Sequence, residues 1–312
     1  MSKVLIISGP TAVGKTEISV EVAKRINGEV VNADSMQVYK GMDIGTAKIT
    51  KEEMCGVPHH LFDIVEPTDS FDVAEYKRRA KACIEEISMR DHIPILVGGT
   101  GFYIQAVLKD INFDEGDPDP AIRERFQKIA DDEGHDRLYD MLKSIDPEAA
   151  TSIHPNNIKR VIRALEYHEQ TGKLISDHNR EQSLKPSPYD HLYAVLTLPR
   201  EILYDRIDKR VDLMLDSGLI DEVRSLIVRG VPRNSTAMQA LGYKEIIPYL
   251  YGEYDLDEAI RILKRDTRHF AKRQLTWFKR EPESVYFDKS KYTDSQLLSE
   301  AIVDEFDNVA GD

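Results

Sequence analysis

The pattern of hydrophobic and polar residues predicts a sheet whose strands are separated by helices. Four short apolar runs have the length and the branched side chains of buried parallel strands: Val4–Ser8, Glu29–Ala33, Ile93–Gly98 and Leu192–Leu198. Between the second and third runs, Ala74–Met89 carries apolar residues at helical spacing. Because strands and helices alternate, we expect an α/β fold with a doubly wound parallel sheet.

The alternation fails between residues 113 and 187. The segment 114–120 has the Asp, Gly and Pro content of a turn, and a second proline-rich turn lies at 185–188. Between these turns the apolar spacing is helical throughout. The expected helices are Ala121–Asp132, His135–Ser144, Asp146–Ile153 and Asn157–Thr171. We therefore expect an all-helical insertion domain at 113–187, within a core formed by 1–112 and 188–312.

A complete phosphate-binding loop follows the first predicted strand. Residues 9–16 read Gly-x-x-x-x-Gly-Lys-Thr, and a helix predicted over Glu17–Asn27, closed by Gly28, comes directly after them. In this order of strand, loop and helix, backbone N–H groups converge on an anion. Lys15 adds a charge for a β-phosphate, and Thr16 offers a hydroxyl to Mg²⁺. A chance match is the alternative, but both flanking elements fit, so we expect a P-loop NTPase-like core that binds a polyphosphate.

Two further segments end predicted strands, where doubly wound sheets bind their ligands. Asp34 follows the second strand; its carboxylate can hold Mg²⁺ through water or accept a proton from a nucleophile, and a helix N-cap is the alternative. The third strand ends in Gly98–Gly101, where an ATP-hydrolysing enzyme usually carries a second carboxylate. Thr100 offers a hydroxyl there, although a tight turn without a ligand explains the glycines equally well. The missing carboxylate counts against an ordinary NTPase.

A pair of arginines forms another candidate anion site. Arg206 and Arg210 are four residues apart on a helix predicted over Glu201–Ser217. Like charges at this spacing repel by about 0.2–0.5 kcal/mol unless an anion such as a diphosphate lies beside them. The alternative is that both arginines pair, on a solvated surface, with aspartates of the same helix. These aspartates are Asp205, Asp208 and Asp212. From Arg200 the chain is expected to be helical to about Lys279.

The net charge of −13 argues at first against a nucleic-acid partner, but the charge is unevenly distributed. Residues 261–280 hold eight Lys and Arg against one acid, Asp266. The first turns of the last expected insertion helix carry Lys159, Arg160 and Arg163. Positive charge at a helix N-terminus opposes the helix dipole, so this placement is more natural if an external anion lies nearby. Both features favour a polyanionic partner, and a solvated basic face is the alternative for 261–280.

Length and composition fit a globular protein of one large or two ordinary domains, with 312 residues, 41% hydrophobic and 31% charged. No apolar stretch has the length of a membrane span, and the first strand begins too early for a signal peptide. Cys55 and Cys83 provide neither a disulfide framework nor a metal-binding spacing. We expect a cytoplasmic protein without a membrane partner, and a monomer because no long exposed apolar stripe is evident.

The ordered series of motifs resembles one family, the tRNA dimethylallyltransferases, also called tRNA isopentenyltransferases. Besides the phosphate loop, the long block Asp34–Lys48 is a highly specific match. Shorter matching blocks follow in order over nearly the whole chain. They are Pro58–Ile64, Gly98–Tyr103, His154–Arg160, Gln239–Glu245 and Thr267–Trp277.

The resemblance implies transfer of a dimethylallyl group from dimethylallyl diphosphate to N6 of adenosine 37, next to the anticodon of tRNA, giving N6-isopentenyladenosine. The phosphate loop would then bind a diphosphate and not ATP, which accounts for the missing carboxylate. The insertion and the basic helix would grip the anticodon stem-loop together with the core. Mg²⁺ is the expected cofactor, with Thr16 as its protein ligand.

The resemblance also implies roles for residues of this sequence. Catalysis is expected from Asp34, Lys15, Arg210 and Thr100, with Asp34 accepting or orienting the N6 proton. The diphosphate is expected to contact Gly9, Pro10, Thr11, Ala12, Val13, Gly14, Lys15, Thr16, Arg206 and Arg210. The tRNA is expected to contact Asp34, Ser35, Met36, Gln37, Thr100, Arg123, Ile158, Lys159, Arg160, Val161, Ile162, Gln239 and Lys244.

Other functions share some of these features. A small-molecule or nucleoside kinase using ATP suits the phosphate loop and Asp34 equally well, but Gly98–Gly101 and the basic segment 261–280 count against it. A non-catalytic RNA- or nucleotide-binding regulator is a second alternative, which the phosphate loop beside Asp34 disfavours. A related enzyme that prenylates free adenine nucleotides shares the core motifs, whereas the helical insertion and the basic helices favour tRNA.

Overall fold

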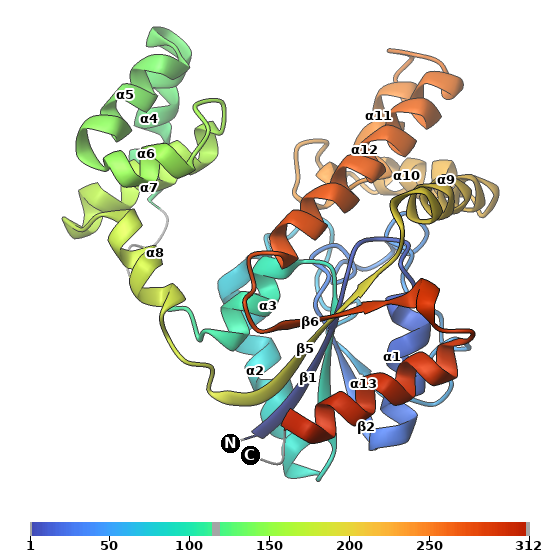
Figure 1. Cartoon of the computed structure of the whole chain (residues 1–312). Helices are drawn as coiled ribbons and strands as arrows, with labels where there is room; N and C mark the ends of the chain where they lie inside the picture. The colour runs from blue at the N-terminus through green and yellow to red at the C-terminus, as the bar shows by residue number, and fades with distance from the viewer. Residues whose placement is uncertain (1, 114–118, 310–312) are drawn as a thin grey trace. The chain divides into compact units, whose positions relative to one another are not determined.

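Six parallel strands form one sheet in the α/β part of the protein (Figure 1). The computed structural model describes residues 2–113 and 119–309. Across the sheet the order is β3-β2-β4-β1-β5-β6, and every neighbouring pair is parallel. The strands are β1 Ser2–Ser8, β2 Gly28–Asn32, β3 His59–His60, β4 Ile93–Gly98, β5 Tyr189–Thr197 and β6 Ser284–Asp288. The predicted fold class is confirmed.

The four central strands follow from the sequence, whereas the two edge strands do not. β2, β4, β1 and β5 correspond to the four apolar runs, and β1 is buried from Val4 onward, as expected for a strand covered on both faces. β3 has only two residues, and β6 is a short strand that pairs with β5 alone. Neither edge strand carries an apolar run long enough to stand out in the sequence.

Helices cover both faces of the sheet (Figure 1). On one face lie α1 and α13, whose Val20 and Ile302 belong to the same hydrophobic cluster as Leu5 of β1. On the other face lie α2 and α3, and α2 buries Tyr76 and Ile84 against the sheet. An aliphatic side chain such as Ile84 contributes about 1.5–3 kcal/mol when fully buried. These helices are α1 Lys15–Ile26, α2 Val73–Met89, α3 Gly101–Leu108 and α13 Ser295–Val309.

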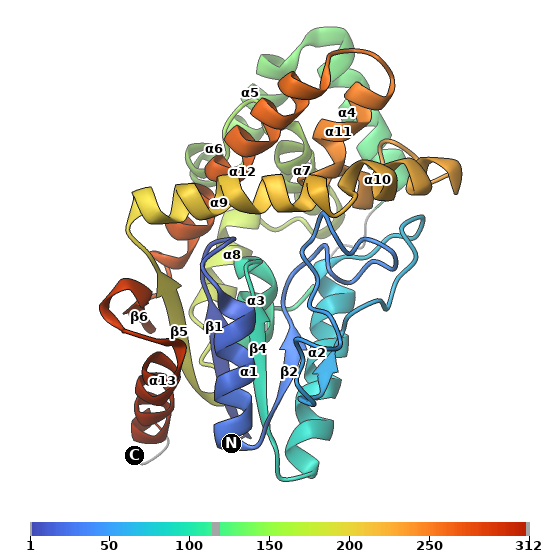
Figure 2. The same ribbon diagram turned by 90° about the vertical axis from the view of Figure 1, so that its right-hand side faces the viewer.

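A second group of helices lies beyond the carboxyl ends of the strands (Figure 2). They are α9 Arg200–Asp216, α10 Leu219–Val228, the 3-10 helix η1 Ala237–Gln239, α11 Tyr243–Leu250 and α12 Leu256–Phe278. The sequence predicts helix throughout this region, but Gly230 and Gly252 take positive φ values and end two of these helices. The group covers the edge at which parallel α/β sheets bind ligands.

The predicted end of the first helix is wrong by one residue. Asn27, at φ 53°, closes α1, and its N–H donates to the Ala23 carbonyl oxygen. Gly28 is the first residue of β2, where an added Cβ would lie 2.6 Å from the Ile95 side chain. The glycine therefore permits close packing against β4 and does not supply a left-handed cap.

The chain divides into two compact units. One contains Met1–Val107 and Pro188–Asp312, and the other is Leu108–Ser187, against an expected insertion at 113–187. The second unit is helical, and Leu138 and Leu165 lie at its hydrophobic core. Its helices are α4 Pro120–Glu133, α5 His135–Ile145, α6 Pro147–Ser152, α7 Ile158–Thr171 and α8 Ile175–Ser183.

One expected turn lies mostly outside the described residues, and one observed helix was not expected from the sequence. Most of the turn expected at 114–120 lies outside the described residues, which omit 114–118. α8 was not predicted, because its sequence is mostly polar. Within the described ranges, no helix is long and apolar enough to cross a membrane.

Candidate active site

The phosphate loop joins β1 to α1 and depends on glycine at two positions. Gly14 has a φ of 98°, in the left-handed region that other residues rarely adopt. At Gly9 an added Cβ would lie 2.6 Å from the Leu196 carbonyl oxygen of β5. The Lys15 ammonium lies over the loop and donates to the carbonyl oxygens of Gly9 and Pro10 at 2.9 and 3.0 Å. A positive charge and a helix N-terminus thus meet at one place.

A cavity of about 110 Å³ opens at this loop. Burial lowers the pKa of Lys15 to about 8; Asp34 opposes this shift and Arg210 adds to it. Burial also lowers the pKa of Arg210, again against the attraction of Asp34. Two cations therefore face one carboxylate, an arrangement that favours an anionic ligand. Of the predicted site residues, the cavity is lined by Thr11, Ala12, Gly14, Lys15, Thr16, Asp34, Gln37 and Arg210.

Val13 has a supporting position in the loop. Its side chain is fully buried in the hydrophobic core, and its N–H donates to the Pro10 carbonyl oxygen at 3.3 Å. Gly9 and Pro10 are themselves buried. These three residues hold the shape of the loop, while Thr11, Gly14 and Lys15 present it to the cavity.

Asp34 does not cap a helix. Its carboxylate accepts the N–H of Met36 at 2.9 Å, and its own N–H donates to the Asn32 side chain at 3.0 Å. The next helix of the described chain, α2, begins only at Val73. The N-cap alternative is therefore excluded. The contacts orient a carboxylate that lines the cavity opposite Lys15 and Arg210.

Thr100 contacts the segment that carries Asp34. Its hydroxyl accepts the N–H of Ser35 at 3.0 Å and donates to the Ser35 hydroxyl at 3.3 Å. An added Cβ at Gly98 would lie 2.1 Å from the Ala33 carbonyl oxygen. The glycines after β4 therefore allow the ends of β2 and β4 to approach, and the Thr100 hydroxyl holds the residue after Asp34.

Arg206 and Arg210 of α9 have no ion-pair or hydrogen-bond partner among the described side chains. Arg210 lines the cavity, and the Arg206 guanidinium lies 3.4 Å from where a Cβ of Gly14 would be. The aspartates of this helix pair with other cations. The pairs are Asp205–Lys209 at 2.8 Å, Asp208–Arg268 at 2.5 Å and Asp212–Lys264 at 2.6 Å. Surface pairing is thus excluded, and both guanidinium groups are free to meet an anion.

Gln274, which the sequence analysis did not single out, bridges two segments of the site. From α12, its side-chain oxygen accepts the N–H of Thr11 at 2.9 Å, and its amide nitrogen donates to the Gly99 carbonyl oxygen at 3.0 Å. The side chain is buried, and its bond to Gly99 is shielded from water. Gln274 lies inside the block Thr267–Trp277, and that block was the available signal.

Part of the cavity is apolar, which the sequence analysis also missed. Ile49, Phe62 and Phe270 line it, and Phe62 packs against the core cluster that contains Ile49. His59 lines it too; burial lowers its pKa, and its Nδ1 lies 2.8 Å from the Val57 carbonyl oxygen. The ring is therefore neutral near pH 7. The cavity suits a ligand with one anionic end and one small hydrophobic end.

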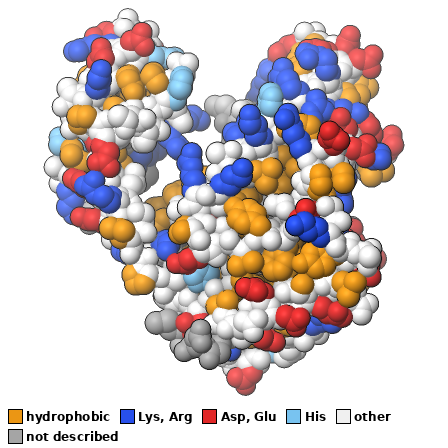
Figure 3. Space-filling view, in the orientation of Figure 1, with side chains coloured by type: hydrophobic (Ala, Val, Ile, Leu, Met, Phe, Trp, Pro, Cys, Tyr) orange, Lys and Arg blue, Asp and Glu red, His pale blue; other side chains and the backbone are white. Residues whose placement is uncertain are grey.

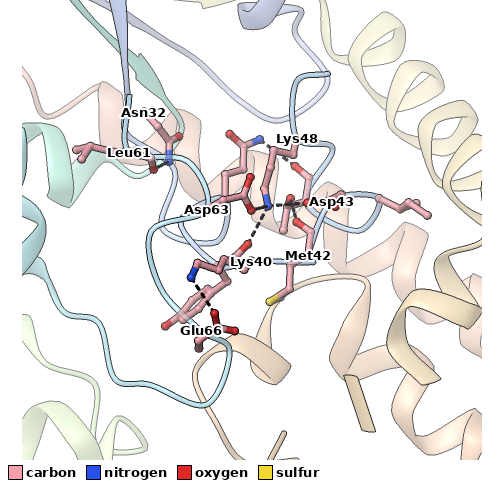
Figure 4. Close-up of polar contacts among 12 residues, drawn as sticks. Asn32, Lys40, Met42, Asp43, Lys48, Leu61, Asp63 and Glu66 are labelled. Atoms are coloured by element: carbon pink, nitrogen blue, oxygen red, sulfur yellow. Dashed lines mark hydrogen bonds and ion pairs between the residues drawn. The ribbon is translucent and has the colours of Figure 1, made fainter. Parts of the chain in front are cut away.

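The segment 35–48 is folded around a buried lysine (Figure 4). The Lys48 ammonium donates to the Tyr39 carbonyl oxygen at 2.8 Å and pairs with Asp43 at 2.7 Å and Asp63 at 2.6 Å. Its side chain is only 6% exposed. Removing one partner of such a buried group is costly, so the three contacts hold the segment in one conformation.

The basic segment 261–280 lies mainly on α12 and carries a groove. Figure 3 shows Lys and Arg side chains gathered over this helix. The groove combines positive charge with the Trp277 ring, a combination that suits the phosphates and bases of RNA. It is lined by His269, Lys272, Arg273, Thr276, Trp277 and Arg280.

In the helical unit, most of the predicted tRNA-contacting residues are engaged in its own structure. Arg123 pairs with the fully buried Glu166 at 2.8 Å. Val161 and Ile162 lie in the hydrophobic core of the unit, and Ile158 packs against it. The side chains of Val161 and Ile162 therefore face other helices and not solvent.

Lys159 and Arg160 differ from these residues. Both are exposed in the first turn of α7, and neither forms an ion pair within the described part of the chain. Asn157, the residue before the helix, provides no side-chain cap. Two positive charges near uncapped N–H groups form a local anion-attracting surface.

Gln239 and Lys244 lie near one another on the core unit. They line a pocket together with Arg233 and Tyr254. The Gln239 amide donates to the Arg233 carbonyl oxygen at 3.0 Å, and the Lys244 ammonium lies 3.6 Å from the buried Glu245 carboxylate. Each residue therefore has a protein partner and also a solvent-accessible surface.

The motifs and this geometry agree with one known family. Residues 37–281 match the family model described as IPP transferase. The chain belongs to the IPP transferase family. The phosphate loop lies just ahead of the matched range, and Asp34–Lys48 overlaps its beginning. The resemblance inferred from the motifs is confirmed.

The similarity to individual relatives and solved structures covers nearly the whole chain. The tRNA dimethylallyltransferase of Lachnoclostridium phytofermentans is 56% identical over 303 residues, covering 97% of each chain. That of Carboxydothermus hydrogenoformans is 51% identical over 309 residues, covering 97% of this chain and 99% of the other. The structure of the Bacillus halodurans tRNA isopentenylpyrophosphate transferase matches with a TM-score of 0.74 and 46% identity, over 99% of this chain and 98% of that one. A eukaryotic dimethylallyltransferase acting on tRNA matches with a TM-score of 0.84 and 32% identity, over 99% and 80%.

Proposed function

We propose that this protein transfers a dimethylallyl group from dimethylallyl diphosphate to N6 of adenosine 37 of tRNA, giving N6-isopentenyladenosine. The observation that carries the proposal is the single cavity lined by the phosphate loop, Arg210 and Asp34. It offers an anion site, a carboxylate and an apolar wall, which are the three surfaces this reaction needs. Relatives 51% and 56% identical over nearly their full length carry the name of this activity.

In this proposal the phosphate loop binds the diphosphate of the donor. The loop N–H groups, the Lys15 ammonium and the Arg210 guanidinium face the anion, and Arg206 adds charge beside Gly14. The bond from the allylic carbon to the diphosphate oxygen breaks in a loose transition state, so negative charge builds up on the leaving group. Cations already in place stabilise that charge without reorganisation. The apolar wall with Phe62 takes the five-carbon tail.

In this proposal the Asp34 carboxylate accepts the proton that the acceptor amine loses. N6 forms a bond to the allylic carbon as the diphosphate leaves, and the alkylated nitrogen must then lose one proton. The Asp34 carboxylate lines the same cavity, and the Met36 N–H holds it in orientation. A positioned general base contributes about 10²–10⁴-fold. Thr100, through Ser35, keeps the Asp34 segment in place.

Mg²⁺ is part of the proposal, with Thr16 as its protein ligand. The described residues contain no group of three or more His, Cys, Asp or Glu side chains placed to hold a metal ion. A single hydroxyl beside a phosphate loop fits Mg²⁺, because this ion keeps several waters and takes substrate phosphates as ligands. When bound, Mg²⁺ supplies additional positive charge to the diphosphate.

The acceptor in this proposal is the anticodon stem-loop of tRNA. The groove on α12, the segment Gln239–Lys244, and Lys159 with Arg160 supply positive charge for its phosphates. Adenosine 37 must leave its stack to reach Asp34, which costs less in a single-stranded loop than in a duplex. Ser35, Met36 and Gln37 follow Asp34 directly and are therefore assigned to the neighbourhood of the base.

We propose that the protein acts as a monomer in the cytoplasm, where its substrates are available.

The deciding experiment uses purified protein, Mg²⁺, unmodified tRNA and labelled dimethylallyl diphosphate, with labelled ATP in a parallel reaction. We expect label in tRNA at N6 of adenosine 37, with ATP unchanged. Omitting Mg²⁺ and adding EDTA should lower the rate. Phosphate transfer from ATP without prenyl transfer would contradict the proposal and favour a kinase.

A further inference from the structure

Glu222, outside the cavity, is the acceptor for four donors at once. It lies in the first turn of α10. One carboxylate oxygen accepts the N–H groups of Asp43 and Ile44, each at 2.8 Å. The other accepts the N–H of Gly45 at 3.0 Å and the hydroxyl of Tyr243 at 2.6 Å. Three successive N–H groups converging on one anion form a nest, which fixes the conformation of the loop backbone.

On one side, Glu222 is tied to the start of α11. Tyr243 is fully buried, and an added Cβ at Gly45 would lie 2.5 Å from its ring. Burial and the neighbouring Glu222 charge raise the pKa of Tyr243, so the hydroxyl is a proton donor at every physiological pH. Tyr243 also lies inside the segment Gln239–Lys244, to which the proposed function assigns tRNA contact.

On the other side, the loop held by Glu222 continues into the wall of the cavity. Thr46 and Ala47 line the cavity, as does Gln37. The Gln37 amide donates to the carbonyl oxygens of Thr46 and Ala47 at 3.0 and 3.3 Å. The Lys48 ammonium then pairs with Asp43 (Figure 4). One carboxylate thus stands between the proposed tRNA-contacting segment and the wall of the donor cavity.

We propose that Glu222 is a positioning residue for prenyl transfer. It holds the loop 43–47 against Tyr243, so that Thr46, Ala47 and Gln37 keep the shape of the cavity that orients the donor. This inference rests on the proposed function. In the proposed reaction Glu222 touches neither the prenyl donor nor the tRNA acceptor, and it acts through the backbone of the loop 43–47. Displacing reacting atoms by about 1 Å costs about 10²-fold in rate, so a loosened loop has a large kinetic effect.

The test compares Glu222→Gln with Asp221→Asn. Glutamine keeps the size of the side chain but replaces one acceptor oxygen by an NH₂ group, which cannot accept the loop N–H groups. Asp221 lies beside Glu222 on the same helix, is exposed and pairs with Arg224, so its variant removes the same charge without touching the loop. We expect Glu222→Gln to lower the single-turnover rate about 10- to 100-fold at saturating donor and tRNA. Asp221→Asn should stay within about twofold.

A third variant keeps the test decisive if Glu222→Gln does not fold. Tyr243→Phe removes one of the four donors and should lower the same single-turnover rate about threefold to tenfold. Thermal unfolding is measured for every variant. A lower melting temperature with an unchanged rate per folded molecule shows a merely structural role and overturns the inference. If the wild-type protein transfers label and both variants match it, the inference alone fails; if the wild type transfers none, the proposed function fails first.

Discussion

Two pairs of arginines, one in each unit of this protein, have opposite surroundings. In the α/β unit, Arg206 and Arg210 have no carboxylate partner among the described residues, although their helix carries three nearby aspartates. In the helical unit, Arg123 and Arg163 both bind the buried Glu166. The comparison teaches that a count of charges does not identify an anion site. The fold decides which positive side chains remain available to a phosphate.

In the helical unit, the buried Glu166 carboxylate occupies both arginines. Although burial alone raises the pKa of Glu166, hydrogen bonds from Arg123, the Asp119 N–H and Arg163 hold it below its usual value. A carboxylate with a lowered pKa adds stability above its unfolded-state pKa, and that stability is lost as the pH falls. In the α/β unit the corresponding carboxylate, Asp34, lines a cavity instead, where a ligand can complete the charge balance.

The largest expected effect concerns Asp34. Asp34→Ala should slow the chemical step about 10²–10⁴-fold, because the acceptor amine loses its proton acceptor. The affinity for tRNA should change little, since one carboxylate contributes little to binding a polyanion. Single-turnover kinetics and tRNA filter binding measure the two quantities. A near-normal chemical step would remove Asp34 from the mechanism and, with it, the contrast to Glu166.

Arg210 tests whether an arginine without a carboxylate partner serves the donor. Arg210→Gln should weaken the binding of dimethylallyl diphosphate about 10- to 100-fold, the usual effect of losing hydrogen bonds to a charged group. The matched control is Arg268→Gln, because Arg268 pairs with Asp208. Calorimetric titration of the donor compares them, and equal losses would mean that partner status does not predict anion binding.

Lys15 provides a pH test of the same cavity. Its pKa of about 8 lies below the ordinary lysine value, so the ammonium is charged well below pH 8, and the charge is lost as the pH rises through 8. A diphosphate needs the charged form, so donor affinity should fall above this pH by up to about tenfold per pH unit. Titrating the donor between about pH 7 and 9 measures this slope. Lys15→Ala should bind weakly and lack it; a wild-type affinity that is flat over this range would contradict the assignment.

The smallest effects separate the two kinds of cation in the helical unit. Replacing Lys159 and Arg160 by Gln together should weaken tRNA binding about 3- to 10-fold and lower the salt slope by about 1.4–1.8. Arg123→Gln should instead lower the free energy of unfolding by about 1–2 kcal/mol, since Arg163 still pairs with Glu166 and Arg123 is partly exposed. Filter binding at several salt concentrations measures the salt slope, and chemical denaturation measures the free energy of unfolding. An unchanged salt slope for the double variant would argue against RNA contact at α7.

Much of the core was predictable because its signals are local. The strands β1, β2, β4 and β5 are contiguous apolar runs, and the eight residues of the phosphate loop lie directly between a predicted strand and a predicted helix. The placement of Asp34 beside that loop follows from the rule that ligands meet the carboxyl ends of parallel strands. The edge strand β3 and the polar helix α8 carry no such pattern and were missed.

The sequence by itself determined the fold class, the phosphate loop and the family, because each is written in short stretches of adjacent residues. The tertiary structure alone decided that Asp208 pairs with Arg268 and not with its neighbour Arg210, that Gln274 joins Thr11 to Gly99, and that Val161 and Ile162 are core residues. These contacts join residues far apart in the chain. Which of several nearby partners a side chain takes depends on packing and burial in the whole unit, and no local pattern records it.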